Sequence, residues 1–175
     1  MTTQLVDKKG DNNVWITPKS FIKVVEEYFG GPIPLDPATE PNNPTDALKF
    51  FTEQDNGLIQ PWSNVPGVFV NPPYSKGSMP AWTKKIEEEA AKGAIIIALL
   101  PCGARFSTKY WQTNALSQRL NAICFVKGRL KFSLRDGTVG SRNLYDSQIY
   151  GYNVDAAKFK LVFSKLGRAS SVHFS

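Results

Sequence analysis

Residues 65–74 decide the fold, and they read Val-Pro-Gly-Val-Phe-Val-Asn-Pro-Pro-Tyr. The first six contain three valines and a phenylalanine, which is typical of a buried strand. Two consecutive prolines, Pro72 and Pro73, cannot continue a sheet ladder because proline has no backbone N–H to donate. The motif Asn71-Pro-Pro-Tyr74 is therefore predicted to lie in the loop at the carboxyl end of a strand, which is where open α/β sheets bind ligands.

Helices and strands are expected to alternate on either side of this strand. Before it, we expect a helix with Thr17 as N-cap and Pro18 at its first position, a short strand over 33–35 that ends at Asp36, and a short helix over 46–51. After it, the hydrophobic spacing predicts a helix over 80–92, a buried strand over 94–100, a helix over 108–119 and a strand over 122–126. This order is typical of a layered α/β fold.

The last third of the chain has a different pattern. Residues 130–134, 147–152 and 160–163 alternate like antiparallel strands. We therefore expect a mostly parallel sheet with an antiparallel C-terminal edge, a common combination in such folds. Residues 1–13 are polar and are expected to form a flexible arm before a single domain over 14–175.

Composition excludes several classes of protein. The chain has 175 residues, 42% of them hydrophobic and 21% charged, as in soluble globular proteins. The longest apolar run, 94–100, is too short to span a bilayer. Cys102 and Cys124 lack metal-ligand spacing and are expected to be reduced packing residues of a cytoplasmic protein. The single histidine, His173, lies at the C-terminus, which argues against histidine-based catalysis.

Charge is divided unevenly along the chain. Residues 1–75 carry five Lys/Arg against nine Asp/Glu, whereas residues 76–175 carry sixteen against six. Within 102–145 there are eight basic residues and one acid, Asp136. Such segregation is expected when one part of a protein holds a cationic ligand and another meets a polyanion. A basic protein with solvated lysines is the alternative, and charge alone leaves both open.

The residue types in Asn71-Pro-Pro-Tyr74 fit the methylation of an exocyclic aromatic amine. Such an amine is a poor nucleophile because its lone pair is delocalised into the ring. The Asn71 side-chain carbonyl and a proline backbone carbonyl are two acceptors that can hold the amine hydrogens and aim the lone pair at a methyl donor. Tyr74 offers an aromatic face for a base extruded from the duplex. The alternative is a rigid turn with a packed tyrosine.

These residues give the chain a resemblance to the phage-type DNA N6-adenine methyltransferases, the Dam family of phages. The resemblance extends from about Trp15 to Phe132 and includes segments 15–18, 35–38, 55–58, 68–75 and 128–132 in the family's order. It implies a Rossmann-like, S-adenosylmethionine-dependent methyltransferase fold with Asn71, Pro72, Pro73 and Tyr74 as the catalytic loop.

The resemblance also implies a cofactor site. It places Asp36 and Pro37 near the methionine part of S-adenosylmethionine, with Thr17 and Pro18 beside it and Asp55 at the cofactor's adenine; Trp15 and Asn71 complete the predicted contacts. Alternatives remain for three of these residues. Asp36 caps the following loop instead, Asp55 orders the Asn56-Gly57 turn instead, or Trp15 is a packing residue.

Two departures from the family pattern concern the cofactor site. The segment after Asp36 contains no glycine through Pro44, although methyltransferases of this fold usually have a glycine-rich loop there. Only 34 residues separate Asp36 from Asn71, so we expect a sheet truncated between the first strand and the strand before the motif. The acidic residue for the ribose is not assigned, and Glu40 and Glu53 are both candidates.

The chain is too short for a separate DNA-recognition domain, so double-stranded DNA is expected to contact loops and the basic stretch 102–145. Candidates for DNA binding are Lys76, Arg105, Lys109, Arg129, Lys131, Phe132, Arg135 and Arg142. Phe132 is a candidate for stacking on the extruded base opposite Tyr74, and packing in the core is the alternative for this residue.

The leading hypothesis is a DNA adenine methyltransferase, acting in the cytoplasm of a bacterial host if it is phage-encoded. Two alternatives remain open from sequence: an N-methyltransferase for RNA or protein glutamine, and a DNA-binding protein with a catalytically weak methyltransferase fold. The recognition sequence and the oligomeric state are not predicted.

Overall fold

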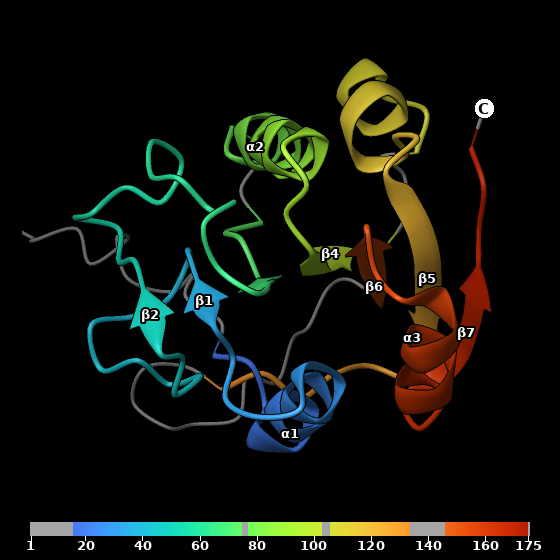
Figure 1. Cartoon of the computed structure of the whole chain (residues 1–175), viewed down its shortest axis with the longest axis horizontal. Coiled ribbons are helices and arrows are strands. Elements are labelled where there is room, and N and C mark those ends of the chain that lie inside the picture. The colour runs from blue at the N-terminus through green and yellow to red at the C-terminus, as the bar shows by residue number, and fades with distance from the viewer. Residues whose placement is uncertain (1–15, 75–76, 103–105, 134–145, 175) are drawn as a thin grey trace, which may run out of the picture.

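The computed structural model describes residues 16–74, 77–102, 106–133 and 146–174 as a three-layered α/β structure (Figure 1). Helix α2 and the π-helix η1 lie on one face of the central sheet, and α1 and α3 lie on the other. The elements are α1 (Lys19–Phe29), β1 (Leu35–Asp36), β2 (Lys49–Phe50), β3 (Val68–Val70), α2 (Met79–Ala91), β4 (Ile96–Pro101), η1 (Trp111–Ala115), β5 (Leu120–Val126), β6 (Ser147–Tyr152), α3 (Ala156–Phe163) and β7 (Gly167–Ser171). Among these residues no helix has the length and apolar character needed to cross a membrane.

The five-stranded sheet has the order β3-β4-β6-β5-β7. Strand β3 runs parallel to β4, whereas β6 is antiparallel to both of its neighbours and β7 is antiparallel to β5. The mixed α/β class and the antiparallel edge are confirmed. The prediction of a mostly parallel sheet is wrong for the described ladders, because β6 is inserted between β4 and β5 and makes both of these pairings antiparallel.

The first two strands form a small sheet of their own beside β3. Strands β1 and β2 pair parallel to each other in a second, two-stranded sheet, and β1 contacts β3. Strand β2 therefore lies on one side of β1, whereas β3, followed by β4, lies on the other side of β1. A reversal of this kind leaves a crevice at the carboxyl ends of the strands.

Buried strand β4 divides the core in two. All its residues are buried; Ile96, Ala98 and Leu100 pack in one hydrophobic cluster, whereas Ile97 and Leu99 pack in the other. A strand covered by helices on both faces has this composition. The predicted apolar strand and the helix that opens near Pro80 are confirmed.

Three of the predicted elements are wrong. The expected helix over 46–51 is strand β2, since its backbone pairs with the segment around β1 through Leu48 N–H to Ile33 O and Phe51 N–H to Asp36 O. Residues 130–133 form no strand beyond an isolated bridge between Ser133 and Ile16, and residue 134 lies outside the described residues.

The expected strand over 160–163 belongs to helix α3. The Asp155 side chain accepts a hydrogen bond from Lys158 N–H at 3.0 Å and caps this helix. Phe159, Val162 and Phe163 recur at helical spacing and are buried. Two other predictions hold only in part. The helix expected over 108–119 is reduced to η1, and Pro18 rather than Thr17 is the N-cap of α1.

Candidate active site

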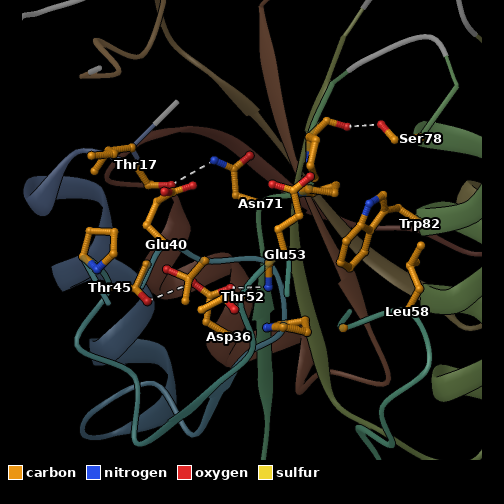
Figure 2. A pocket seen from close by; sticks show the side chains of 18 of the residues that line it. Thr17, Asp36, Glu40, Thr45, Thr52, Glu53, Leu58, Asn71, Ser78 and Trp82 are labelled. Atoms are coloured by element: carbon orange, nitrogen blue, oxygen red, sulfur yellow. Dashed lines mark hydrogen bonds between the residues drawn. The ribbon is translucent and has the colours of Figure 1, made fainter. Parts of the chain in front are cut away.

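A cavity of about 470 Å³ lies where β1 and β3 end (Figure 2). Small-molecule sites commonly have volumes of about 300–1,000 Å³. Its walls come from the last residue of β1 and the loop after it (36–40 and 44–45), the segment after β2 (52–53 and 56–58), and the motif after β3 (71–74). Ile16, Thr17, Ser78 and Trp82 complete the lining.

The motif after β3 is held by its neighbours. Asn71 Nδ2 donates to Thr17 Oγ1 at 3.0 Å, which leaves the Asn71 carbonyl oxygen as an acceptor (Figure 2). The Tyr74 hydroxyl donates to the Leu99 backbone oxygen at 3.2 Å, so β4 anchors the ring. Ser78 Oγ donates to the Pro73 carbonyl at 2.6 Å. The Pro72 carbonyl is therefore the better candidate for binding a substrate amine.

Asp36 is buried at the floor of the cavity, with only 2% of its surface exposed. Its carboxylate accepts from Ala38 N–H at 3.0 Å and from Thr45 Oγ1 at 2.8 Å. Burial raises the pKa of Asp36 to about 6, although the hydrogen bonds from Ala38, Thr45 and Thr39 oppose this shift. Among the described residues, no salt bridge includes Asp36.

Polar side chains shape the glycine-free loop after β1. Asn43 has a left-handed backbone, with φ of 46°. Its side-chain oxygen accepts from Ala47 N–H at 3.2 Å, and its Nδ2 donates to the Ala47 carbonyl at 3.0 Å. Asparagine tolerates this conformation better than most residues. The loop thus obtains its tight turn without a glycine.

The glycine that allows close approach stands on the opposite wall. A Cβ on Gly57 would lie 1.9 Å from the Pro37 backbone oxygen. No residue with a side chain fits there unless the two segments move apart. Gly57 and Pro37 both line the cavity, so this contact brings its two walls together.

The acidic residues near the cavity differ in where they lie. Glu40 and Glu53 line it, and Glu53 follows β2 (Figure 2). Asp55 is exposed and is absent from the lining. Its carboxylate accepts from Thr52 N–H at 2.8 Å and Thr52 Oγ1 at 2.7 Å, and these hydrogen bonds lower its pKa. These contacts support the alternative interpretation, in which Asp55 orders the Asn56-Gly57 turn.

The structure brings most predicted cofactor residues together. Thr17, Asp36, Pro37 and Asn71 line one cavity, together with Pro72, Pro73 and Tyr74. Pro18 caps α1 beside Thr17 without lining the cavity, and Trp15 lies outside the described residues. Sequence reasoning did not assign the other lining residues to the site, among them Thr45, Gly57, Leu58 and Trp82. Gly57 follows Asn56 in a pair that signals only a turn, and Trp82 fits a helix core equally well.

The predicted DNA-binding residues are less completely placed. Lys109, Arg129 and Lys131 are exposed, and Arg129 Nε lies 3.2 Å from Asp146 Oδ1. Phe132 is 1% exposed and packs in the cluster that contains Phe21 and Phe69. This burial supports the core-packing alternative and leaves Phe132 no face for a base. Lys76, Arg105, Arg135 and Arg142 lie outside the described residues.

Comparison with known proteins assigns the class. The model of the DNA N-6-adenine-methyltransferase (Dam) family matches residues 3–149. A protein of Haemophilus phage HP1 (strain HP1c1), described as DNA N-6-adenine-methyltransferase, is 29% identical over 132 residues, covering 75% of this chain and 73% of that protein.

The chain belongs to the DNA N-6-adenine-methyltransferase (Dam) family. It is an enzyme that methylates N6 of adenine in DNA, and DNA is its substrate. S-adenosylmethionine is the general methyl donor of methyltransferases, and the predicted family and activity are confirmed.

Proposed function

We propose that the cavity between β1 and β3 binds S-adenosylmethionine, in a truncated Rossmann-like methyltransferase fold. The cavity lies at the carboxyl ends of strands where the strand order reverses, as ligand sites in such sheets do. Its volume of about 470 Å³ suits a nucleoside-sized ligand. This cofactor carries a sulfonium and an ammonium group, and Asp36, Glu40 and Glu53 give the cavity the opposite charge.

The two ends of the cavity suggest how the cofactor is held. Asp36 is buried with only neutral hydrogen-bond donors, so a cationic ligand would supply a charged partner for it. Glu53 follows β2, the strand parallel to the first, which is the place of the acidic ribose ligand in dinucleotide-binding folds. Leu58 and Trp82 offer apolar surface for an adenine ring.

The motif at the mouth of the cavity positions the target amine. The Asn71 carbonyl oxygen and the Pro72 carbonyl each accept one hydrogen of the adenine N6 amine, which takes the nitrogen lone pair out of conjugation with the ring and directs it at the methyl donor. One of these two hydrogens leaves as a proton once the nitrogen is methylated. The bound cofactor supplies the electrophilic methyl group. Tyr74, fixed to β4 by its hydroxyl, stacks on a base that has left the duplex, since the amine is unreachable inside it.

Exposed basic residues hold the DNA backbone. Three of the candidates lie in the described part of the chain and are exposed: Lys109, Arg129 and Lys131. The proposal also includes four candidates from the sequence that lie outside the described residues: Lys76, Arg105, Arg135 and Arg142. Phosphate contacts by such residues give affinity and salt dependence without sequence specificity.

One observation carries this proposal: the residues after β1 and the motif after β3 open into the same cavity. The test is Asn71→Ala, assayed with tritiated cofactor on duplex DNA. We expect methyl transfer to fall by about 1,000-fold, at the upper end of the range for loss of one preorganised hydrogen bond to the transition state. Cofactor and DNA binding should stay within a few-fold. Survival of methyl transfer in this variant would refute the proposed role of the motif.

A further inference from the structure

Helix α2 carries a buried carboxylate, Glu89, that does not line the cavity. It is 0% exposed and accepts four hydrogen bonds. Oε2 accepts from the backbone N–H groups of Trp62 and Ser63 at 3.0 and 3.1 Å. Oε1 accepts from Lys85 Nζ at 2.8 Å and Lys92 Nζ at 2.9 Å. The carboxylate thus ties a loop after β2 to the last turn of α2.

The charges around Glu89 are unusual for a position inside a small protein. Lys85 is only 8% exposed, and its ammonium also lies 5.5 Å from the centre of the Trp62 ring. Burial alone would raise the pKa of Glu89, but the hydrogen bonds from Lys85, Lys92 and Trp62 outweigh it and lower the pKa to about 2. Glu89 is therefore ionised at neutral pH, and its acceptors are fully occupied.

Trp62 passes this constraint on to the cavity. Its backbone is held by Glu89, and its indole Nε1 donates to the Gly57 carbonyl at 2.9 Å. Gly57 in turn packs against the Pro37 carbonyl, where a Cβ would not fit. The Trp62 ring also stacks on Trp82, with 6.1 Å between centroids and 28° between planes. Gly57, Pro37 and Trp82 all line the cavity.

We propose that Glu89 is a positioning residue for the cofactor: through Trp62 it fixes Gly57 and Trp82 as one wall of the cavity. This inference rests on the proposed cofactor site. Glu89 touches neither the cavity nor the Asn71 motif, so its effect should fall on cofactor affinity and leave the chemical step nearly unchanged.

The first test is Glu89→Gln, with Glu88→Gln as the matched control. Glutamine offers one oxygen where the carboxylate has two, so it leaves either the loop N–H groups or the lysines without an acceptor. Calorimetric titration with S-adenosylmethionine and S-adenosylhomocysteine should show a Kd raised by roughly 10-fold. The turnover number at saturating cofactor should change less than about threefold. Glu88 is exposed on the same helix and pairs with Lys84, so Glu88→Gln should leave both quantities unchanged.

A second variant tests the path through Trp62. Trp62→Phe keeps an aromatic ring and the backbone N–H but removes the indole donor to Gly57. It should raise the Kd by about 3- to 10-fold. In the double variant with Glu89→Gln, the effects should combine to less than the product of the single effects, since both act on one wall. Multiplicative effects would show independent roles and overturn the path.

A third variant separates failure of this inference from failure of the cofactor site. Glu53→Ala alters a carboxylate that lines the cavity. If it weakens cofactor binding while folded Glu89→Gln lowers only the unfolding temperature at an unchanged Kd, the site stands and the positioning role of Glu89 is refuted. If neither variant changes the Kd, the cofactor site itself is misplaced. A raised Kd in both supports the inference.

Discussion

Asp36 and Glu89 are two buried carboxylates with opposite surroundings. Asp36 is 2% exposed and receives hydrogen bonds from Ala38 N–H and Thr45 Oγ1, both neutral groups. Glu89 is 0% exposed and receives two of its four hydrogen bonds from lysine ammonium groups. Burial raises the pKa of Asp36 to about 6, whereas the lysines and Trp62 N–H overcome burial and lower that of Glu89 to about 2.

This difference separates a binding group from a structural one. A buried carboxylate without a cation is costly to ionise, and such groups concentrate at functional sites. Asp36 lines the cavity, where a cationic ligand can complete its surroundings. Glu89 already has its partners within the fold, so removing one of them leaves an unpaired buried charge. We therefore expect Asp36 to govern ligand affinity and Glu89 to govern stability as well as the shape of the wall.

The largest expected effect comes from Asp36→Asn, which tests whether Asp36 is the carboxylate that binds the ligand. We expect the Kd for S-adenosylmethionine to rise by roughly 100-fold, because the neutral amide cannot pair with a cationic group. The unfolding free energy at pH 8 should not fall, because the variant removes an uncompensated charge. Asp55→Asn, an exposed turn residue, is the control and should change the Kd less than twofold. An unchanged Kd in Asp36→Asn would place the ammonium elsewhere.

Next in size is the loss of stability in Glu89→Gln. Removing one partner of a buried charge network costs about 3 kcal/mol, measured as the free energy of unfolding in urea at pH 7. Glu88→Gln, on the exposed side of α2, should stay within about 0.5 kcal/mol of the parent. Equal stability of the two variants would mean that the Glu89 network contributes nothing.

The pH dependence of stability should have opposite signs for the two groups. Asp36 has a raised pKa, so its ionisation destabilises the fold increasingly as pH rises from about 4 to about 6. Glu89 has a lowered pKa, so its stabilisation is full above about 4.5 and is lost as pH falls toward about 2. Each contribution is on the order of 1–3 kcal/mol. Urea unfolding across pH 3–8 checks this: Asp36→Asn should remove the first trend and Glu89→Gln the second.

Cofactor affinity should also depend on pH through Asp36. Below about pH 6 the free protein holds Asp36 protonated, so a cationic ligand must release that proton to bind. The Kd should rise by up to tenfold per pH unit below 6, and Asp36→Asn should flatten this dependence. A flat profile in the parent protein would contradict the assignment of Asp36.

The smallest effect is expected at an exposed ion pair, where a carboxylate lies in solvent and not in the core as Asp36 and Glu89 do. Arg129 and Asp146 have side chains 64% and 66% exposed. Asp146→Asn should therefore change the unfolding free energy by less than about 0.5 kcal/mol. It should tighten DNA binding about twofold by releasing Arg129, measured by fluorescence anisotropy.

In contrast, reversing the charges of Arg129 and Lys131 should weaken DNA binding and flatten its salt dependence, with Lys160→Glu on α3 as the control. Unchanged affinity would relocate the DNA face.

Sequence predicted the elements whose pattern is local. The strand before Asn71 and the apolar strand over 94–100 follow from composition and proline placement, and both are present as β3 and β4. The segment 46–51 could not be predicted in this way, because β2 forms only through pairing with β1. The position of β6 inside the sheet is likewise set by strand order, which no local pattern encodes.

The candidate site likewise contains residues that sequence could predict and residues that only the tertiary structure reveals. Thr17, Asp36 and the Asn71 motif were identified from residue type and family order, and they line one cavity. The resemblance placed Asp55 at the cofactor's adenine, whereas in the structure Asp55 accepts hydrogen bonds from Thr52 and does not line the cavity. Glu89 reads as one acid among several on an amphipathic helix, and only the packing of Trp62 against α2 distinguishes it from Glu88.

The most direct measurement compares Asn71→Asp with Asn71→Ala in forming N6-methyladenine in duplex DNA, quantified by nucleoside mass spectrometry. Aspartate keeps an acceptor for the amine, and its carboxylate can accept from the Thr17 hydroxyl in place of the present contact. Asn71→Asp should keep methylation within about 100-fold of the parent, and Asn71→Ala should lose about 1,000-fold at unchanged cofactor Kd. Equal activity of the two variants would contradict the central claim that the acceptor at position 71 directs the transfer.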